Sequence, residues 1–141
     1  MASTRNIVFV CLHGSGKSLI AAEYLRRLAA QRGLDIGAKS VAPDPDPEVP
    51  PKVVQGLLEG GMDVRGYRPR RITPEELATA SHVVSFGCGL GDVAPPGLTV
   101  ERWDDIPEAR VDFNDARDFI VARLQELLDR VQVAKNNRGR D

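Results

Sequence analysis

The chain has 141 residues but only two cysteines, few aromatic side chains (5%) and no excess of charge of either sign, with a net charge of −1. Two cysteines cannot build a disulfide framework, so we expect a reducing, cytoplasmic setting. The balanced charge argues against nucleic acid or a membrane surface as the main partner. No apolar run could span a bilayer, and no signal peptide is expected. In such a setting a free thiol is either a buried small side chain or part of the chemistry.

Apolar strand patterns alternate with amphipathic helix patterns along the whole chain. Strands are expected at 7–10, 37–41, 82–86 and 98–103, and helices at 18–32, 52–59, 115–133 and after Thr73. Short buried strands separated by helices predict an α/β fold: one three-layer domain over 1–141, with a four-stranded parallel sheet in the order 2-1-3-4 flanked by helices. The polar residues 135–141 are expected to fray.

The most informative segment follows the first strand, from Cys11 to Ser18. Glycine-rich turns between a strand and a helix aim backbone N–H groups at one point and form anion sites. The ending Gly16-Lys17-Ser18 also fits a nucleotide-binding loop, but that loop needs glycine where this chain has Cys11. A cysteine under a bound oxyanion is instead a candidate nucleophile. We therefore expect the oxyanion to be held by the loop that comprises Leu12, His13, Gly14, Ser15, Gly16, Lys17 and Ser18.

The chain resembles the low-molecular-weight protein tyrosine phosphatases and, within that superfamily, the thiol-dependent arsenate reductases. The loop is similar to their C-x5-R-S motif, with Lys17 in the arginine place. The stretches 61–73, 80–86 and 103–107 are similar to further family segments, so the resemblance covers roughly residues 6–130. It implies that Cys11 attacks phosphorus or arsenic while Ser18 donates a hydrogen bond to its sulfur. Gly14 stands where the family uses an asparagine in a left-handed conformation.

Lys17 is the main departure from the family pattern. An arginine binds two oxyanion oxygens at once, whereas an ammonium is a point charge that loses this bidentate geometry. Losing one charged hydrogen bond in the transition state costs about 1.5–3 kcal/mol, or roughly ten- to a hundredfold in rate. We expect oxyanion binding to survive this exchange better than the turnover of phosphate esters.

The acidic residues after Trp103 and the loop residue His13 each have more than one possible role. The resemblance implies a general acid in Trp103-Asp104-Asp105-Ile106-Pro107, with Asp105 as our choice and Asp104 as the alternative, although both could be solvated turn residues. His13 replaces a family glycine and is either a second donor to the oxyanion, a base beside Cys11, or a solvated rim residue.

Cys88 follows the third strand as Cys11 follows the first, so both thiols should emerge at one edge of the sheet. It is either a resolving thiol for Cys11 or a buried structural cysteine. The thioredoxin-coupled reductases carry another cysteine a few residues later, and residues 89–95 contain none.

Three functions follow from these patterns. We expect first an arsenate-reductase-like cysteine enzyme, an oxidoreductase that uses a thiol reductant. Next come a low-molecular-weight phosphatase, a hydrolase that forms a phosphocysteine, and a non-catalytic oxyanion-binding protein. No cofactor and no metal site are predicted, and the expected ligand is a phosphate- or arsenate-type oxyanion or a phosphoester.

Overall fold

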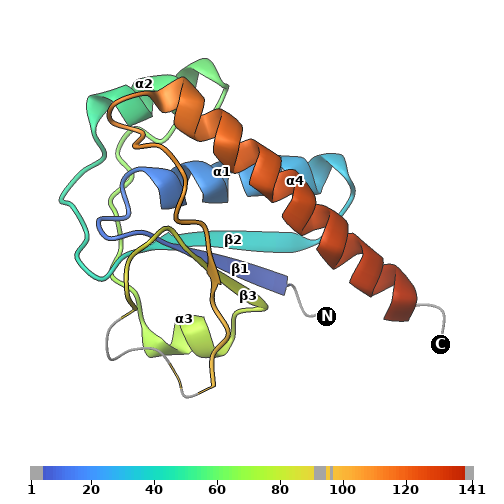
Figure 1. Ribbon diagram of the computed structural model, residues 1–141. Coiled ribbons are helices and arrows are strands. Elements are labelled where there is room, and N and C mark those ends of the chain that lie inside the picture. Colours follow the sequence, from blue (N-terminus) through green and yellow to red (C-terminus); the bar gives the residue numbers. More distant parts are fainter. Residues whose placement is uncertain (1–4, 91–94, 96, 139–141) are drawn as a thin grey trace.

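A computed structural model describes residues 5–90, 95 and 97–138, which form a parallel β-sheet covered by helices on both faces (Figure 1). The four strands are β1 (Arg5–Val10), β2 (Ile36–Val41), β3 (His82–Ser85) and β4 (Glu101–Arg102). Their order in the sheet is β2-β1-β3-β4 and every pairing is parallel. The predicted α/β class, strand order and direction are confirmed. Parallel neighbours place the ends of β1 and β3 side by side, with Val10 opposite Ser85.

The central strand β1 carries apolar side chains on both faces because it is covered on both sides. Ile7 and Phe9 join the larger core cluster, beneath α1 (Lys17–Gln31), α2 (Pro51–Glu59) and α4 (Phe113–Arg138). Val8 and Val10 join the smaller cluster on the face covered by α3 (Pro74–Ala78). This alternation explains why residues 7–10 read as one continuous apolar run.

The helix start predicted at Thr73 is present, and its hydroxyl accepts a hydrogen bond from the Glu76 N–H at 3.2 Å. The last helix begins earlier than predicted, at Phe113, because the Asp112 carboxylate accepts a hydrogen bond from Asp115 N–H and caps it. Its backbone continues to Arg138, past the predicted end at residue 133. Residues 139–141 of the predicted tail lie outside the described residues.

Strand β4 is shorter than the predicted segment 98–103. Only Glu101 and Arg102 pair with β3, opposite Val84 and Ser85. Leu98 lies before this ladder and packs on the smaller core cluster, so its apolar character reflects burial rather than strand pairing.

Aromatic packing holds the segment after β4 against the sheet. Trp103 is buried with its ring centroid 6.0 Å from Phe9 and 5.6 Å from Phe86. Its indole N–H donates to Glu101 at 2.7 Å. The β4–α4 segment is thereby brought alongside the ends of β1 and β3. In the part of the chain that the structure describes, no helix has the length and apolar character needed to cross a bilayer.

Candidate functional site

The segment between β1 and α1 makes a tight turn at the carboxyl edge of the sheet. Gly14 has a φ of +67°, a left-handed conformation that L side chains rarely adopt. A Cβ atom there would come within 3.0 Å of the Ala42 Cβ. Both the backbone angle and the close approach therefore require glycine at this point of the loop.

The neighbouring β2–α2 segment fixes the direction of the loop peptides. The carbonyl groups of Leu12 and His13 accept hydrogen bonds from the N–H groups of Asp44 and Asp46, each at 3.0 Å. In a planar trans peptide the N–H points opposite to its carbonyl, so the N–H groups that follow, at His13 and Gly14, face the inside of the loop. No described residue accepts a hydrogen bond from the backbone N–H groups of residues 12–17. This cradle, at the N-terminus of a 15-residue helix, suits an anion.

A chain of hydroxyl groups leads from the first cysteine into the core. The Cys11 sulfur lies 2.9 Å from the Ser18 Oγ, which lies 2.8 Å from the Ser40 Oγ. Both serines are buried. A thiolate can only accept, so when Cys11 is ionised Ser18 must donate to it and Ser40 must donate to Ser18. Ser18 therefore has the contact that the resemblance implies, and Ser40 adds a second donor behind it.

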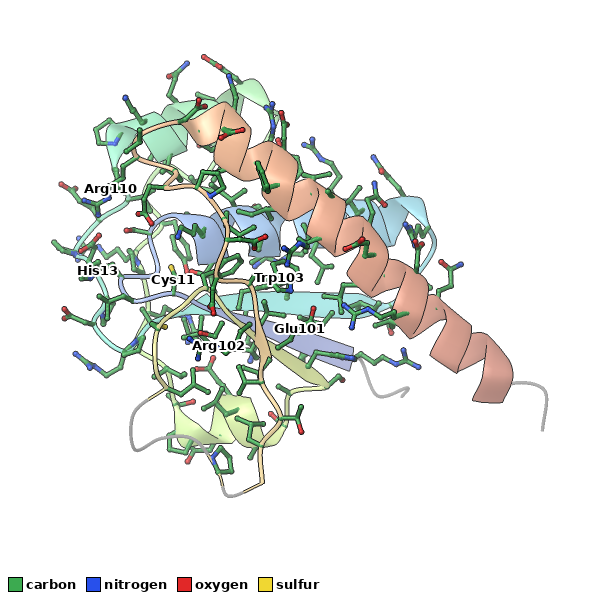
Figure 2. All side chains as sticks on the ribbon, viewed as in Figure 1. Cys11, His13, Glu101, Arg102, Trp103 and Arg110 are labelled. Atoms are coloured by element: carbon green, nitrogen blue, oxygen red, sulfur yellow. The ribbon has the colours of Figure 1, made fainter. Side chains whose placement is uncertain are left out.

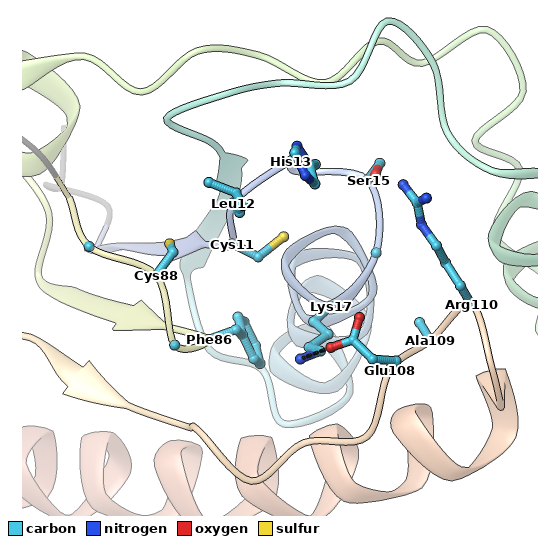
Figure 3. Close-up of a pocket in the computed structure, with 13 residues that line it drawn as sticks. Cys11, Leu12, His13, Ser15, Lys17, Phe86, Cys88, Glu108, Ala109 and Arg110 are labelled. Atoms are coloured by element: carbon cyan, nitrogen blue, oxygen red, sulfur yellow. Dashed lines mark ion pairs between the residues drawn. The ribbon is translucent and has the colours of Figure 1, made fainter.

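A pocket of about 540 Å³ opens over this loop, with Cys11 at its centre and Lys17 and Glu108 at its edge (Figure 3). Figure 2 shows Cys11, His13 and Arg110 together at one end of the molecule. The lining residues come from the loop, the end of β3 and the β4–α4 segment: Cys11, Leu12, His13, Ser15, Gly16, Lys17, Phe86, Gly87, Cys88, Gly89, Glu108, Ala109 and Arg110. Among the described residues no three His, Cys, Asp or Glu side chains are grouped as metal ligands.

Cys88 lines the same pocket as Cys11, and both cysteines are free and half-buried. Burial raises the pKa of the Cys88 thiol above its ordinary value; the contact of its sulfur with the Ser85 hydroxyl acts in the opposite direction, and the charge of Cys11 adds to the increase. Cys88 is therefore mostly a protonated thiol near neutral pH.

The carboxylate in this pocket is Glu108, not either aspartate expected from the sequence. Glu108 Oε2 lies 2.8 Å from the Lys17 ammonium. The Asp105 carboxylate instead pairs with Arg123, and Asp104 pairs with Arg102 at 3.3 Å. Neither aspartate lines the pocket.

A second ion pair ties the β4–α4 segment to the other side of the loop. Asp46 Oδ2 accepts hydrogen bonds from the Ser15 hydroxyl at 2.6 Å and from Arg110 Nη2 at 2.7 Å. The ring of His13 lies 3.7 Å from Asp46 and donates from Nδ1 to the Asp44 carbonyl at 2.9 Å, since a carbonyl can only accept. The Nε2 atom of neutral His13 is thus left as an acceptor.

Sequence reasoning missed Ser40, Asp46, Glu108 and Arg110. Ser40 is a polar residue at a buried strand position, a signal that was available. Glu108 directly follows Pro107, whereas the family pattern directs attention to an acid before a proline. Asp46 lies in a proline-rich segment whose path only the tertiary structure defines.

Comparison with known proteins shows the family to which the chain belongs. The model of the low molecular weight phosphotyrosine protein phosphatase family matches residues 6–89, and the chain belongs to this family. A putative arsenate reductase of Halobacterium salinarum is 26% identical over 132 residues, which cover 90% of this chain and 93% of that protein.

Solved structures with the same fold include YfkJ of Bacillus subtilis, with a TM-score of 0.83, 20% identity, and coverage of 95% of this chain and 98% of that one. The thioredoxin-dependent arsenate reductase of Corynebacterium glutamicum has a TM-score of 0.77 and 26% identity. That match covers 94% of this chain but 64% of the reductase. Family and relatives together support a cysteine-based enzyme that acts on oxyanions.

Proposed function

We propose that this protein is a thiol-dependent arsenate reductase in which Cys11 is the nucleophile. One observation carries the proposal: two free thiols, Cys11 and Cys88, line the pocket above the glycine-rich loop between β1 and α1. A phosphatase needs only the first thiol, whereas reduction needs a second one to accept the oxidation. The arsenate reductase names of two relatives, each 26% identical, support the same choice.

The reaction balances with two thiols. The Cys11 thiolate attacks arsenic, an S–As bond forms, and an As–O bond breaks with the oxygen leaving as water after taking up protons. A second thiol then attacks the Cys11 sulfur. An S–S bond forms and the S–As bond breaks, with its electron pair retained by arsenic. Arsenate is thus reduced to arsenite while two thiols are oxidised to a disulfide.

Cys88 is the second thiol in this proposal. Its raised pKa keeps it mostly protonated and slow to react in the resting enzyme, which protects the enzyme from internal oxidation. Cys88 loses its proton to solvent as it attacks the Cys11 sulfur. A thiol reductant, either a thioredoxin-type protein or a small thiol, then returns the disulfide to two thiols.

The test compares arsenate reduction and para-nitrophenyl phosphate hydrolysis in the wild type, Cys11→Ser and Cys88→Ser, with the exposed Ser81→Ala as the matched control. We expect arsenate turnover with thioredoxin, which both cysteine variants lose and the control keeps. Hydrolysis without any arsenate reduction would replace this proposal with the phosphatase alternative, in which Cys11 forms a phosphocysteine.

Family membership is the observation that favours the phosphatase alternative. The third function, oxyanion binding without turnover, is favoured by the Lys17 exchange and by Ile106, which separates Asp105 from Pro107. It would be established if sulfate or phosphate bound to the loop while no Cys11-dependent turnover occurred with either substrate.

A further inference from the structure

The single cation contributed by the oxyanion loop is already paired in this structure. The Lys17 ammonium lies 2.8 Å from Glu108 Oε2, and its side chain is only 15% exposed while that of Glu108 is 67% exposed (Figure 3). Lys17 therefore stays near the loop, while the mobile partner in any rearrangement is the Glu108 carboxylate. An oxyanion entering the loop must compete with Glu108 for this ammonium.

Among the residues that the structure describes, the other titratable or charged groups facing this pair or lying at the pocket rim are Cys11, His13, Asp44, Asp46, Cys88 and Arg110. Neither of the two basic side chains among them, Arg110 and His13, is unpaired and available to the anion. The Arg110 guanidinium is held by Asp46 at 2.7 Å, and His13 is held between Asp44 and Asp46. Lys17 is therefore the cation that Glu108 and a bound oxyanion must share.

We propose that a dianionic oxyanion binds the Lys17 ammonium in place of Glu108, and that the released Glu108 carboxylate takes up a proton. Glu108 then donates this proton to the leaving oxygen. A carboxylate next to a dianion and deprived of its ammonium has a like charge beside it and no partner, which favours the protonated form. The inference rests on the oxyanion site of the proposed function and assigns its general acid to Glu108 rather than Asp105.

The proton-transfer step balances for any ester or hydroxyl leaving group. The Cys11 thiolate forms a bond to phosphorus or arsenic, and the bond from that atom to the leaving oxygen breaks. The leaving oxygen takes its proton from Glu108, which returns to the carboxylate form. The Glu108 carboxylate can then pair with Lys17 again as product departs, which resets the site.

Binding measurements test the coupling between oxyanion binding and protonation of Glu108 without requiring catalysis. Sulfate is a tetrahedral anion that remains a dianion throughout the working pH range, and the Cys11→Ser background removes the loop thiol. Calorimetry in buffers of different ionisation enthalpy should show uptake of about one proton, and affinity should fall as pH rises, by up to about tenfold per pH unit. Adding Glu108→Gln should abolish the uptake and make binding independent of pH, whereas adding His13→Gln should leave the uptake in place.

Proton uptake that survives Glu108→Gln, or that disappears with His13→Gln, would overturn the coupling while leaving the oxyanion site intact. Failure of sulfate and phosphate to bind at all would overturn the proposed function as well.

The rate of turnover provides a second test of which residue is the general acid. With aryl phosphates of increasingly basic leaving groups, Glu108→Gln should lower kcat progressively more, whereas Asp105→Asn should follow the wild-type trend. The reverse pattern would assign the acid to Asp105 and end this inference.

Discussion

The hydroxyl chain behind Cys11 allows a quantitative prediction. Removing the Ser18 hydroxyl deletes one hydrogen bond to a charged sulfur, seen here at 2.9 Å. Such bonds contribute about 1.5–3 kcal/mol, so Ser18→Ala should slow Cys11 alkylation by iodoacetamide at mildly acidic pH by roughly ten- to a hundredfold. The physical reason is that the thiolate, the reacting species, loses its nearest donor.

Ser40→Ala should slow the same reaction less, because Ser40 reaches the sulfur only through Ser18, with a 2.8 Å contact between the two hydroxyl groups. The double variant should therefore react no more slowly than Ser18→Ala alone, which is the non-additivity expected of two groups in one network. Ser81→Ala, at an exposed position, is the control for a serine deletion as such.

The assay follows Cys11 modification by mass spectrometry under conditions where Cys88 is counted separately. Two results would refute the reasoning. One is an alkylation rate unchanged by Ser18→Ala, and the other is a further loss when Ser40→Ala is added to Ser18→Ala.

Three other predictions follow. Lys17→Arg should raise kcat/KM for para-nitrophenyl phosphate about ten- to a hundredfold, because a guanidinium fork binds two oxyanion oxygens. An unchanged value would show that the ammonium already stabilises the transition state as well as a guanidinium does. Peptide mapping after mild oxidation should find a disulfide between Cys11 and Cys88. It should form faster as pH rises, because the raised pKa of Cys88 keeps that thiol protonated at neutral pH. Two persistent free thiols would contradict this prediction. Glu101→Ala should destabilise the fold by about 1–3 kcal/mol at neutral pH, since it leaves the buried indole N–H of Trp103 without an acceptor.

The Glu101 prediction has a defined dependence on pH. Burial alone would raise the pKa of Glu101, but hydrogen bonds from Arg130 and Trp103 bring it below the ordinary value of 4.5. A carboxyl with a lowered pKa stabilises the fold fully above its unfolded value, and this contribution is lost as pH falls through the folded value. The difference between thermal melts of wild type and Glu101→Ala should therefore shrink in acid below that range, although the protonated carboxyl can still accept from the indole N–H; a difference that stayed the same or grew there would contradict the argument.

The fold could be predicted from the sequence because it depends on local patterns. The continuous apolar run at 7–10 indicates a strand covered on both faces, and helix patterns between such strands leave few topologies that satisfy short, right-handed connections. The extent of β4 could not be predicted, because strand pairing depends on where β3 ends. Only two residues of the apolar segment 98–103 find partners there.

The sequence by itself determined the loop between β1 and α1 that we propose binds an oxyanion: a cysteine at a strand end, glycines that permit the turn, and a serine at the start of the helix. These residues are adjacent in the chain, so their geometry follows from local backbone conformation. Only the tertiary structure decided what surrounds the loop. Ser40 and Asp46 come from β2 and the loop that follows it, and Glu108 comes from the β4–α4 segment. The partner of a carboxylate depends on which of these segments passes within hydrogen-bonding distance. That is why Glu108, and not Asp105, is paired with Lys17.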